Sequence, residues 1–226
     1  MGDAALNDGP SGTSGHARAT LRRLAVAAVL AVGLGFLMQA VVLAVTLAEP
    51  AGTGAALLSL VGGVTWSVLI CAGLALGTAI AQGRPYLAGL VGALVAPAAL
   101  GVSKAAQKVM AGWLGAAASP ALVSLATVSV LRAVEYGLLG WLLGRLILRD
   151  EGRASRYLGA GALAGALFGG AIVALTWRAG LVAGAPLTPP RTAAVVLNEV
   201  VFPVGCAAVI YASHLAGRSL RALGPA

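Results

Sequence analysis

Three ionisable residues lie inside long apolar stretches of the chain, and their types suit the handling of ions, protons or polar solutes. Arg132 and Glu135 lie three positions apart near the middle of one stretch, and Glu199 follows Asn198 in another. Residues three apart share neighbouring parts of one helix face. A charge buried in a membrane costs several kcal/mol unless it is paired or hydrated. We therefore expect these side chains to face the interior of a helical bundle.

Two interpretations of this cluster remain open. In the first, Glu135 and Glu199 are the carboxylates of an ion or proton pathway or of a polar-solute site, and Arg132 is an anion contact or counter-ion. In the second, Arg132 and Glu199 form a structural ion pair that sets the register of two helices. We favour the first because a structural pair at this depth is costly to keep. Pro203, four residues after Glu199, adds a helix break of the kind that transporters place beside midplane sites.

Further polar and aromatic residues of the apolar stretches are candidates for lining the same cavity. Each of them alone is also typical of ordinary interhelical hydrogen bonding or packing. The set consists of Gln39, Thr65, Trp66, Ser129, Tyr136 and Pro203.

Enzyme chemistry finds little support in the sequence. His16 and His214 are the only histidines, which excludes a His-rich metal site and haem held by two intramembrane histidines. The chain has no HExxH, GxSxG or Walker motif. Cys71 and Cys206 both lie deep in apolar stretches, where we expect them to act as small hydrophobic residues and not as a redox pair. We expect no metal, no cofactor and no enzymatic activity.

The composition places these residues in a membrane. Of the 226 residues, 59% are hydrophobic and 10% charged, with a mean hydropathy of +0.94, whereas soluble domains carry roughly 25% charged and 45–50% apolar residues. The net charge of +8 would suggest a nucleic-acid partner for a soluble protein. Here the cations flank apolar stretches, as topogenic charges do, so we expect no nucleic acid. The preference for Arg over Lys, with abundant Ala and Gly, is typical of a GC-rich bacterial genome.

Six apolar stretches are long enough to serve as membrane spans, since about 20 helical residues cross a bilayer. Lipid cannot satisfy open backbone groups, so each span must be helical. The third is the shortest, and residues 103–108 could continue it as an interfacial helix with Lys104 and Lys108 on one face. The predicted spans are residues 24–47, 54–81, 86–102, 121–148, 157–177 and 192–213.

The distribution of cations predicts that both termini are cytoplasmic. The segments placed inside hold Arg18, Arg22, Arg23, Arg84, Arg145, Arg149, Arg153, Arg156, Arg218 and Arg221. The segments placed outside hold only Lys104, Lys108, Arg178 and Arg191. The prediction is thus an all-α, polytopic integral membrane helical bundle of six transmembrane helices in the cell membrane, the bacterial inner membrane. Residues 1–20 form a disordered cytoplasmic tail, residues 21–217 the transmembrane domain and residues 218–226 a short cytoplasmic tail.

Glycines spaced four apart predict close helix packing, because both lie on one helix face and let two backbones approach. We favour packing within the chain over homo-oligomerisation. The GxxxG pairs are Gly73/Gly77, Gly140/Gly144, Gly161/Gly165 and Gly165/Gly169. Spans two, four and six are each followed by Gly-Arg, which three tandem helical hairpins would produce, as would low complexity with topogenic arginines.

Three classes of function fit these observations. We favour a small transporter, channel or substrate-binding permease subunit that uses Arg132, Glu135 and Glu199 for ion, proton or polar-solute passage. The second class is a non-transporting membrane subunit that packs against a partner complex. The glycine-rich helix faces favour this class. The third is a membrane-embedded enzyme acting on lipid or peptide, which the missing catalytic set disfavours.

Overall fold

The chain folds into an all-helical membrane bundle. The computed structural model describes residues 11–46, 53–81, 83–115 and 123–222, and this part of the chain contains no strand. Six helices are long and apolar enough to cross a membrane: Leu24–Thr46, Gly54–Ile80, Pro85–Leu114, Leu125–Leu148, Ala154–Val182 and Pro189–Ala216. The prediction of an all-α polytopic bundle of six spans is confirmed.

Four spans are single helices and two contain a π-helical turn. The first four are α1 (Ser11–Thr46), α2 (Thr53–Ile80), α3 (Pro85–Leu114) and α4 (Leu125–Leu148). The fifth comprises α5 (Ala154–Ala164), the π-turn η1 (Gly165–Gly169) and α6 (Gly170–Val182). The sixth comprises α7 (Pro189–Val196), the π-turn η2 (Leu197–Val201) and α8 (Phe202–Ala222).

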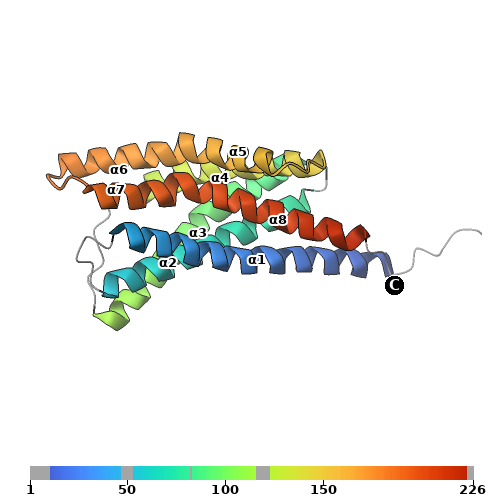
Figure 1. The fold of residues 1–226 in the computed structure, drawn as a ribbon, viewed down its shortest axis with the longest axis horizontal. Helices are drawn as coiled ribbons and strands as arrows, with labels where there is room; N and C mark the ends of the chain where they lie inside the picture. Colours follow the sequence, from blue (N-terminus) through green and yellow to red (C-terminus); the bar gives the residue numbers. More distant parts are fainter. Residues whose placement is uncertain (1–10, 47–52, 82, 116–122, 223–226) are drawn as a thin grey trace, which may run out of the picture.

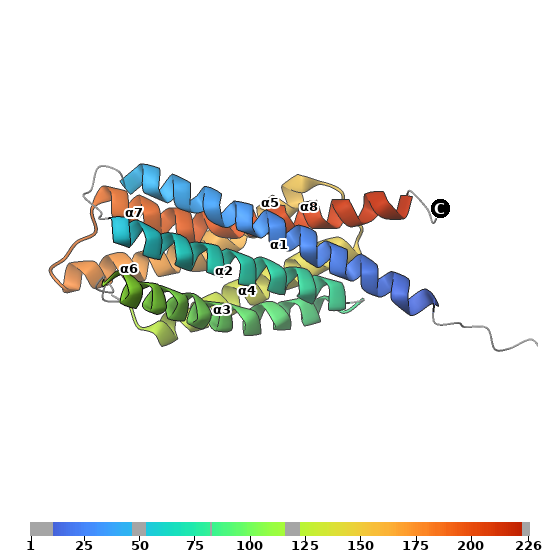
Figure 2. The same cartoon turned by 90° about the horizontal axis from the view of Figure 1, so that it is seen from below.

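The spans run roughly along one axis, and their connections alternate between two ends (Figures 1 and 2). We call the end with Thr46, Leu114 and Val182 the distal end, and the end with the α2–α3 and α4–α5 turns the proximal end. Helices α1 to α4 pack in sequence, and α8 closes the bundle by packing against both α1 and α5. The α2–α3 contact is as extensive as those within the expected hairpins, so three tandem hairpins stay a prediction.

One boundary differs from the sequence-based expectation, and the structure defines another that the sequence left open. Helix α1 begins at Ser11, so the tail predicted to be disordered through residue 20 is helical from that residue on, while residues 1–10 lie outside the described part. Helix α3 continues past Val102 through residues 103–108, as the sequence allowed, and reaches Leu114, where Gly115 ends it in the left-handed conformation. Residues 103–108 are good helix formers, so the helix outlasts the apolar stretch that begins it.

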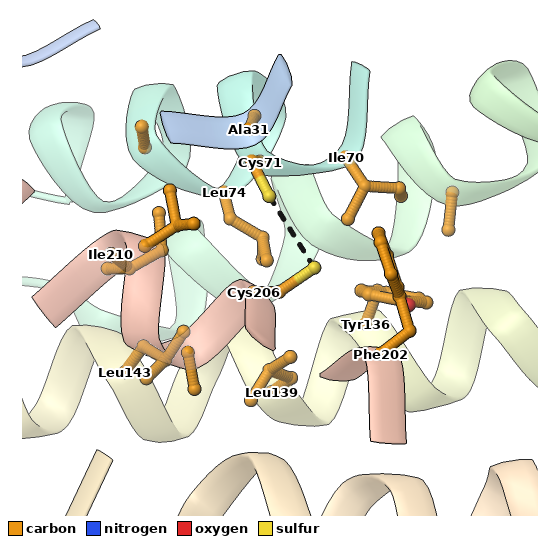
Figure 3. Packing of buried hydrophobic residues seen from close by; sticks show 14 of the residues in the cluster. Ala31, Ile70, Cys71, Leu74, Tyr136, Leu139, Leu143, Phe202, Cys206 and Ile210 are labelled. Carbon is orange, nitrogen blue, oxygen red and sulfur yellow. Dashed lines mark hydrogen bonds between the residues drawn. The ribbon is translucent and has the colours of Figure 1, made fainter. Parts of the chain in front are cut away.

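The bundle interior is apolar around a sulfur contact (Figure 3). The Sγ atoms of Cys71 on α2 and Cys206 on α8 lie 3.5 Å apart, and both cysteines are free thiols. Around them pack Ile70, Leu74, Tyr136, Leu139, Leu143, Phe202 and Ile210, all buried. This cluster joins α2, α4 and α8 beneath the polar cavity described below.

The outer surface of the spans is also apolar. Leu37 on α1, Leu94 on α3, Val130 on α4 and Leu163 on α5 are each half exposed or more. An aqueous solvent would penalise such a belt, whereas lipid does not. The apolar exterior therefore fits contact with a bilayer.

Candidate functional site

The π-turn η2 positions Glu199 and follows from the proline beyond it. Pro203 has no N–H to donate to the carbonyl of Glu199, four residues earlier, and its ring would crowd that carbonyl in a regular helix. The helix forms a wider π-turn instead, in which the N–H of Phe202 donates to the carbonyl of Leu197, five residues back. The expected helix break at Pro203 is thus a π-turn within a continuous span. Such turns occur frequently at functional sites.

Glycines on the fifth span leave room for the widened turn. A Cβ on Gly169 would collide with the carbonyl oxygen of Glu199, and one on Gly165 would collide with that of Val200. Gly161, one turn earlier, faces Pro203 and Val204 in the same way. The GxxxG face of span five therefore packs against the backbone of span six within the chain.

Arg132 on α4 and Glu199 on η2 form an ion pair between spans four and six. The Nη2 of Arg132 donates to Oε1 of Glu199 over 2.6 Å, and the two side chains are only 10% and 13% exposed. The guanidinium carbon of Arg132 also lies 4.1 Å from the centroid of the Trp66 ring on α2. Tyr136 supports that ring edge-on, with centroids 5.5 Å apart. The pair is thus held by three spans.

Glu135 lies beneath this pair, toward the apolar core. It is 1% exposed and interacts electrostatically with both Arg132 and Glu199. Its Oε1 atom has no hydrogen-bond partner in the described chain. Arg132 therefore pairs directly with Glu199, while Glu135 is a second buried carboxyl group close enough to feel both charges.

A cavity of about 410 Å³ opens above the ion pair, toward the distal end. This volume lies in the range of small-molecule sites, roughly 300–1,000 Å³. At 1.5 Å per helical residue, Arg132 lies about 10 Å along the helix axis from the distal start of α4. Lys104 lies about 28 Å along α3 from its proximal start, close to the distal edge of a hydrocarbon layer about 30 Å thick. All six spans contribute lining residues, among them Gln39, Ser59, Trp66, Ser103, Lys104, Gln107, Arg132, Thr176, Asn198 and Glu199.

Two glutamines form a polar rim on either side of α2. Ser59 donates to Oε1 of Gln39 over 2.7 Å, and Nε2 of Gln107 donates to the carbonyl of Leu58 over 3.3 Å. Lys104 donates to Oε1 of Gln107 over 3.2 Å. The adjacent Gly62 and Gly63 accommodate the two amides, because a Cβ on either glycine would meet one of them. The rim therefore depends on a Gly-Gly pair in α2.

Several buried polar atoms at this cavity have no partner within the described residues. They are Nε1 of Trp66, Oγ of Ser103, Nε of Arg132 and Oε2 of Glu199. Buried polar groups are almost always hydrogen-bonded, to protein or to ordered water. These four atoms are buried close to the cavity and make its surroundings polar.

The predicted site residues divide into two groups. Gln39, Trp66, Arg132, Asn198 and Glu199 line the cavity. Glu135, Tyr136 and Pro203 lie behind it, buried, while Thr65 and Ser129 are half-buried and do not line it.

Sequence reasoning missed five polar residues of the lining. Ser103, Lys104 and Gln107 lie on the part of α3 that the sequence offered as an interfacial helix. Ser59 showed no signal apart from being polar within an apolar stretch. The spacing of Ser103 and Gln107, four apart on one helix face, was the available sign. Thr176 on α6 also lines the cavity and was not singled out.

The described residues contain no group of three or more His, Cys, Asp or Glu side chains that could hold a metal ion. The chain matches no protein-family model, no curated protein sequence and no solved structure.

Proposed function

We propose that this protein is a small membrane transporter or substrate-binding permease subunit whose cavity takes up a small polar solute. The observation that supports the proposal is the cavity itself, which all six spans line and which ends on the buried Arg132–Glu199 pair. A purely structural pair needs no polar chamber above it. Arg132 and Glu199 both line the cavity and bring a guanidinium donor and a carboxylate acceptor to its floor.

The charges of the cluster suit coupling to a proton or a cation. If Glu135 and Glu199 are both ionised, the single guanidinium of Arg132 leaves one negative charge uncompensated in apolar surroundings, which is costly. A proton or a bound monovalent cation removes that charge. We infer that the cluster gains and loses such a charge as the solute binds and leaves.

The proposed setting is the cell membrane, with both termini cytoplasmic and the cavity open to the outside. This orientation rests on the excess of cations at the proximal end. Lys104, exposed at the rim, would then lie at the outer boundary of the hydrocarbon layer.

Thiol labelling tests access to the cavity without knowledge of the solute. In a chain whose native cysteines are replaced by Cys71→Ala and Cys206→Ala, Ser59→Cys should react with a membrane-impermeant methanethiosulfonate added to intact cells. Leu94→Cys, on the exposed apolar side of α3, is the matched control and should stay unlabelled, since its surroundings are lipid. Labelling only in inverted vesicles would reverse the proposed orientation. No labelling of Ser59→Cys from either side would contradict a water-filled cavity.

Replacement of the carboxylates tests the coupling. In proteoliposomes under an imposed proton or sodium gradient, Glu135→Gln and Glu199→Gln should reduce flux, read by an internal pH or sodium dye, to the level of empty vesicles. Each variant keeps the shape of the side chain but loses the charge that a proton or cation must balance. Glu151→Gln, in the α4–α5 turn, is the control and should keep wild-type flux. Full flux in both cluster variants would rule out the pathway.

A further inference from the structure

We propose that the cleft between α4 and α5 at the proximal end binds one anionic phospholipid, with the phosphate among arginines and an acyl chain along the apolar floor. This site is separate from the cavity over Arg132 and does not depend on its function. The cleft encloses about 380 Å³.

Three arginines form the polar part of the cleft. Arg145 and Arg149 lie in the last turn and at the end of α4, and Arg156 lies in the first turn of α5. The guanidinium of Arg145 is held 4.9 Å from the centroid of the Trp141 ring. Guanidinium groups match phosphate oxygens in charge and in hydrogen-bond geometry. The arrangement therefore favours a phosphate headgroup with a net negative charge over a zwitterionic or neutral headgroup.

The neighbouring carboxylates leave Arg145 and Arg149 uncompensated. Glu151 pairs with Arg153 at 3.3 Å and with Arg156 at 3.1 Å. The backbone N–H of Arg153, together with these guanidinium groups, holds the pKa of Glu151 below its usual range, so it stays ionised at neutral pH.

Asp150 is the other acidic residue of this turn, and its Oδ1 atom lies 3.8 Å from Nε2 of His214. Within the described chain, neither Arg145 nor Arg149 lies within salt-bridge distance of a carboxylate. The positive charges of Arg145 and Arg149 are therefore available to an anionic ligand.

The rest of the cleft is apolar and points toward the middle of the membrane. Leu146 on α4 and Gly159 and Leu163 on α5 line this part. A Cβ on Gly159 would meet no atom within 4 Å, so the space beside it is open. Leu163 is half exposed. An amphipathic cleft with its basic part at the end of the spans matches a phospholipid, whose phosphate lies at the interface and whose chain lies in the hydrocarbon layer. A soluble anion would have no use for the apolar part.

Thermal unfolding of the full chain in an uncharged maltoside detergent tests the proposal. Added phosphatidylglycerol should raise the midpoint temperature with saturation near one lipid per chain, whereas phosphatidylcholine and inorganic phosphate should not. The double variant Arg145→Gln/Arg149→Gln should bind phosphatidylglycerol about thirty-fold more weakly, because each arginine near the interface strengthens the binding of an anionic lipid several-fold. Arg22→Gln/Arg84→Gln removes the same charge from exposed positions outside the cleft and should change the affinity by less than about twofold.

A second variant tests the apolar half with the charges intact. Gly159→Leu should fill the chain groove and weaken the lipid-dependent shift, with little change in the midpoint temperature without lipid. Equal shifts from phosphatidylglycerol and inorganic phosphate would make the cleft a simple anion site and overturn the proposal. Equal losses of affinity in the cleft and control double variants would show that general surface charge attracts the lipid, and would overturn the proposal. A lipid-dependent shift that is the same in Gly159→Leu as in the wild type would show that no acyl chain occupies the groove.

Discussion

Arg132→Leu should lower the free energy of unfolding by about 3–5 kcal/mol, the usual cost of removing one partner from a buried ion pair. The cost arises because Glu199 is then left buried without its partner, and Glu135 loses the nearby positive charge with which it interacts. Trp66 also loses the cation stacked on its ring, 4.1 Å away in the wild type. Reversible unfolding in mixed micelles or by steric trapping measures the difference. Arg178→Leu, at an exposed position of α6, is the matched control and should change stability by about 0.5 kcal/mol or less.

The double variant Arg132→Leu/Glu199→Leu separates stability from function. Apolar residues that replace both members of a buried ion pair often restore the stability that a single replacement loses. We expect the double variant to unfold more like the wild type than like Arg132→Leu, and yet to lose the flux measured under a proton or sodium gradient. A double variant that recovers both stability and flux would show that the pair only sets helix register. A single variant as stable as the wild type would show that the pair is not buried from water in the membrane.

Gly169→Ala is expected to have the second largest effect, a loss of about 1–3 kcal/mol, as is usual when a packed interior is overfilled. Its new methyl group would collide with the backbone carbonyl of Glu199, which no side-chain rotation can relieve. Span six must then shift, and Glu199 shifts with it. We therefore expect the flux and the stability to fall together, both measured as for the ion pair.

The adjacent residue provides the control. Gly170→Ala adds the same methyl group, but nothing lies within 4 Å of its position. It should leave stability unchanged or raise it by about 0.4–1 kcal/mol, through lower chain entropy in the unfolded state. Equal stability of the two alanine variants would show that spans five and six can separate at no cost, and that their close contact does not position Glu199.

The amino-acid sequence alone was sufficient for the class of fold, and it made the central ion pair geometrically possible. Lipid requires helical spans of about 20 apolar residues, so hydropathy determines their number with little reference to what packs against what. The cost of a charge in lipid turns Arg132, Glu135 and Glu199 inward. Since spans four and six run in the same direction, residues at similar depth on them can meet. The structure shows that Arg132 and Glu199 do.

Only the tertiary structure decided which side chains line the cavity. A helix turns by about 100° per residue, so one position separates Trp66, which lines it, from Thr65, which does not. Hydropathy falls at Ser103, but the backbone of α3 continues for three more turns and carries Lys104 and Gln107 to the rim. Rotation, tilt and length of a helix depend on its neighbours, above all on glycines such as Gly165 and Gly169 that let backbones meet. These contacts are formed by residues distant in sequence, and no local pattern records them.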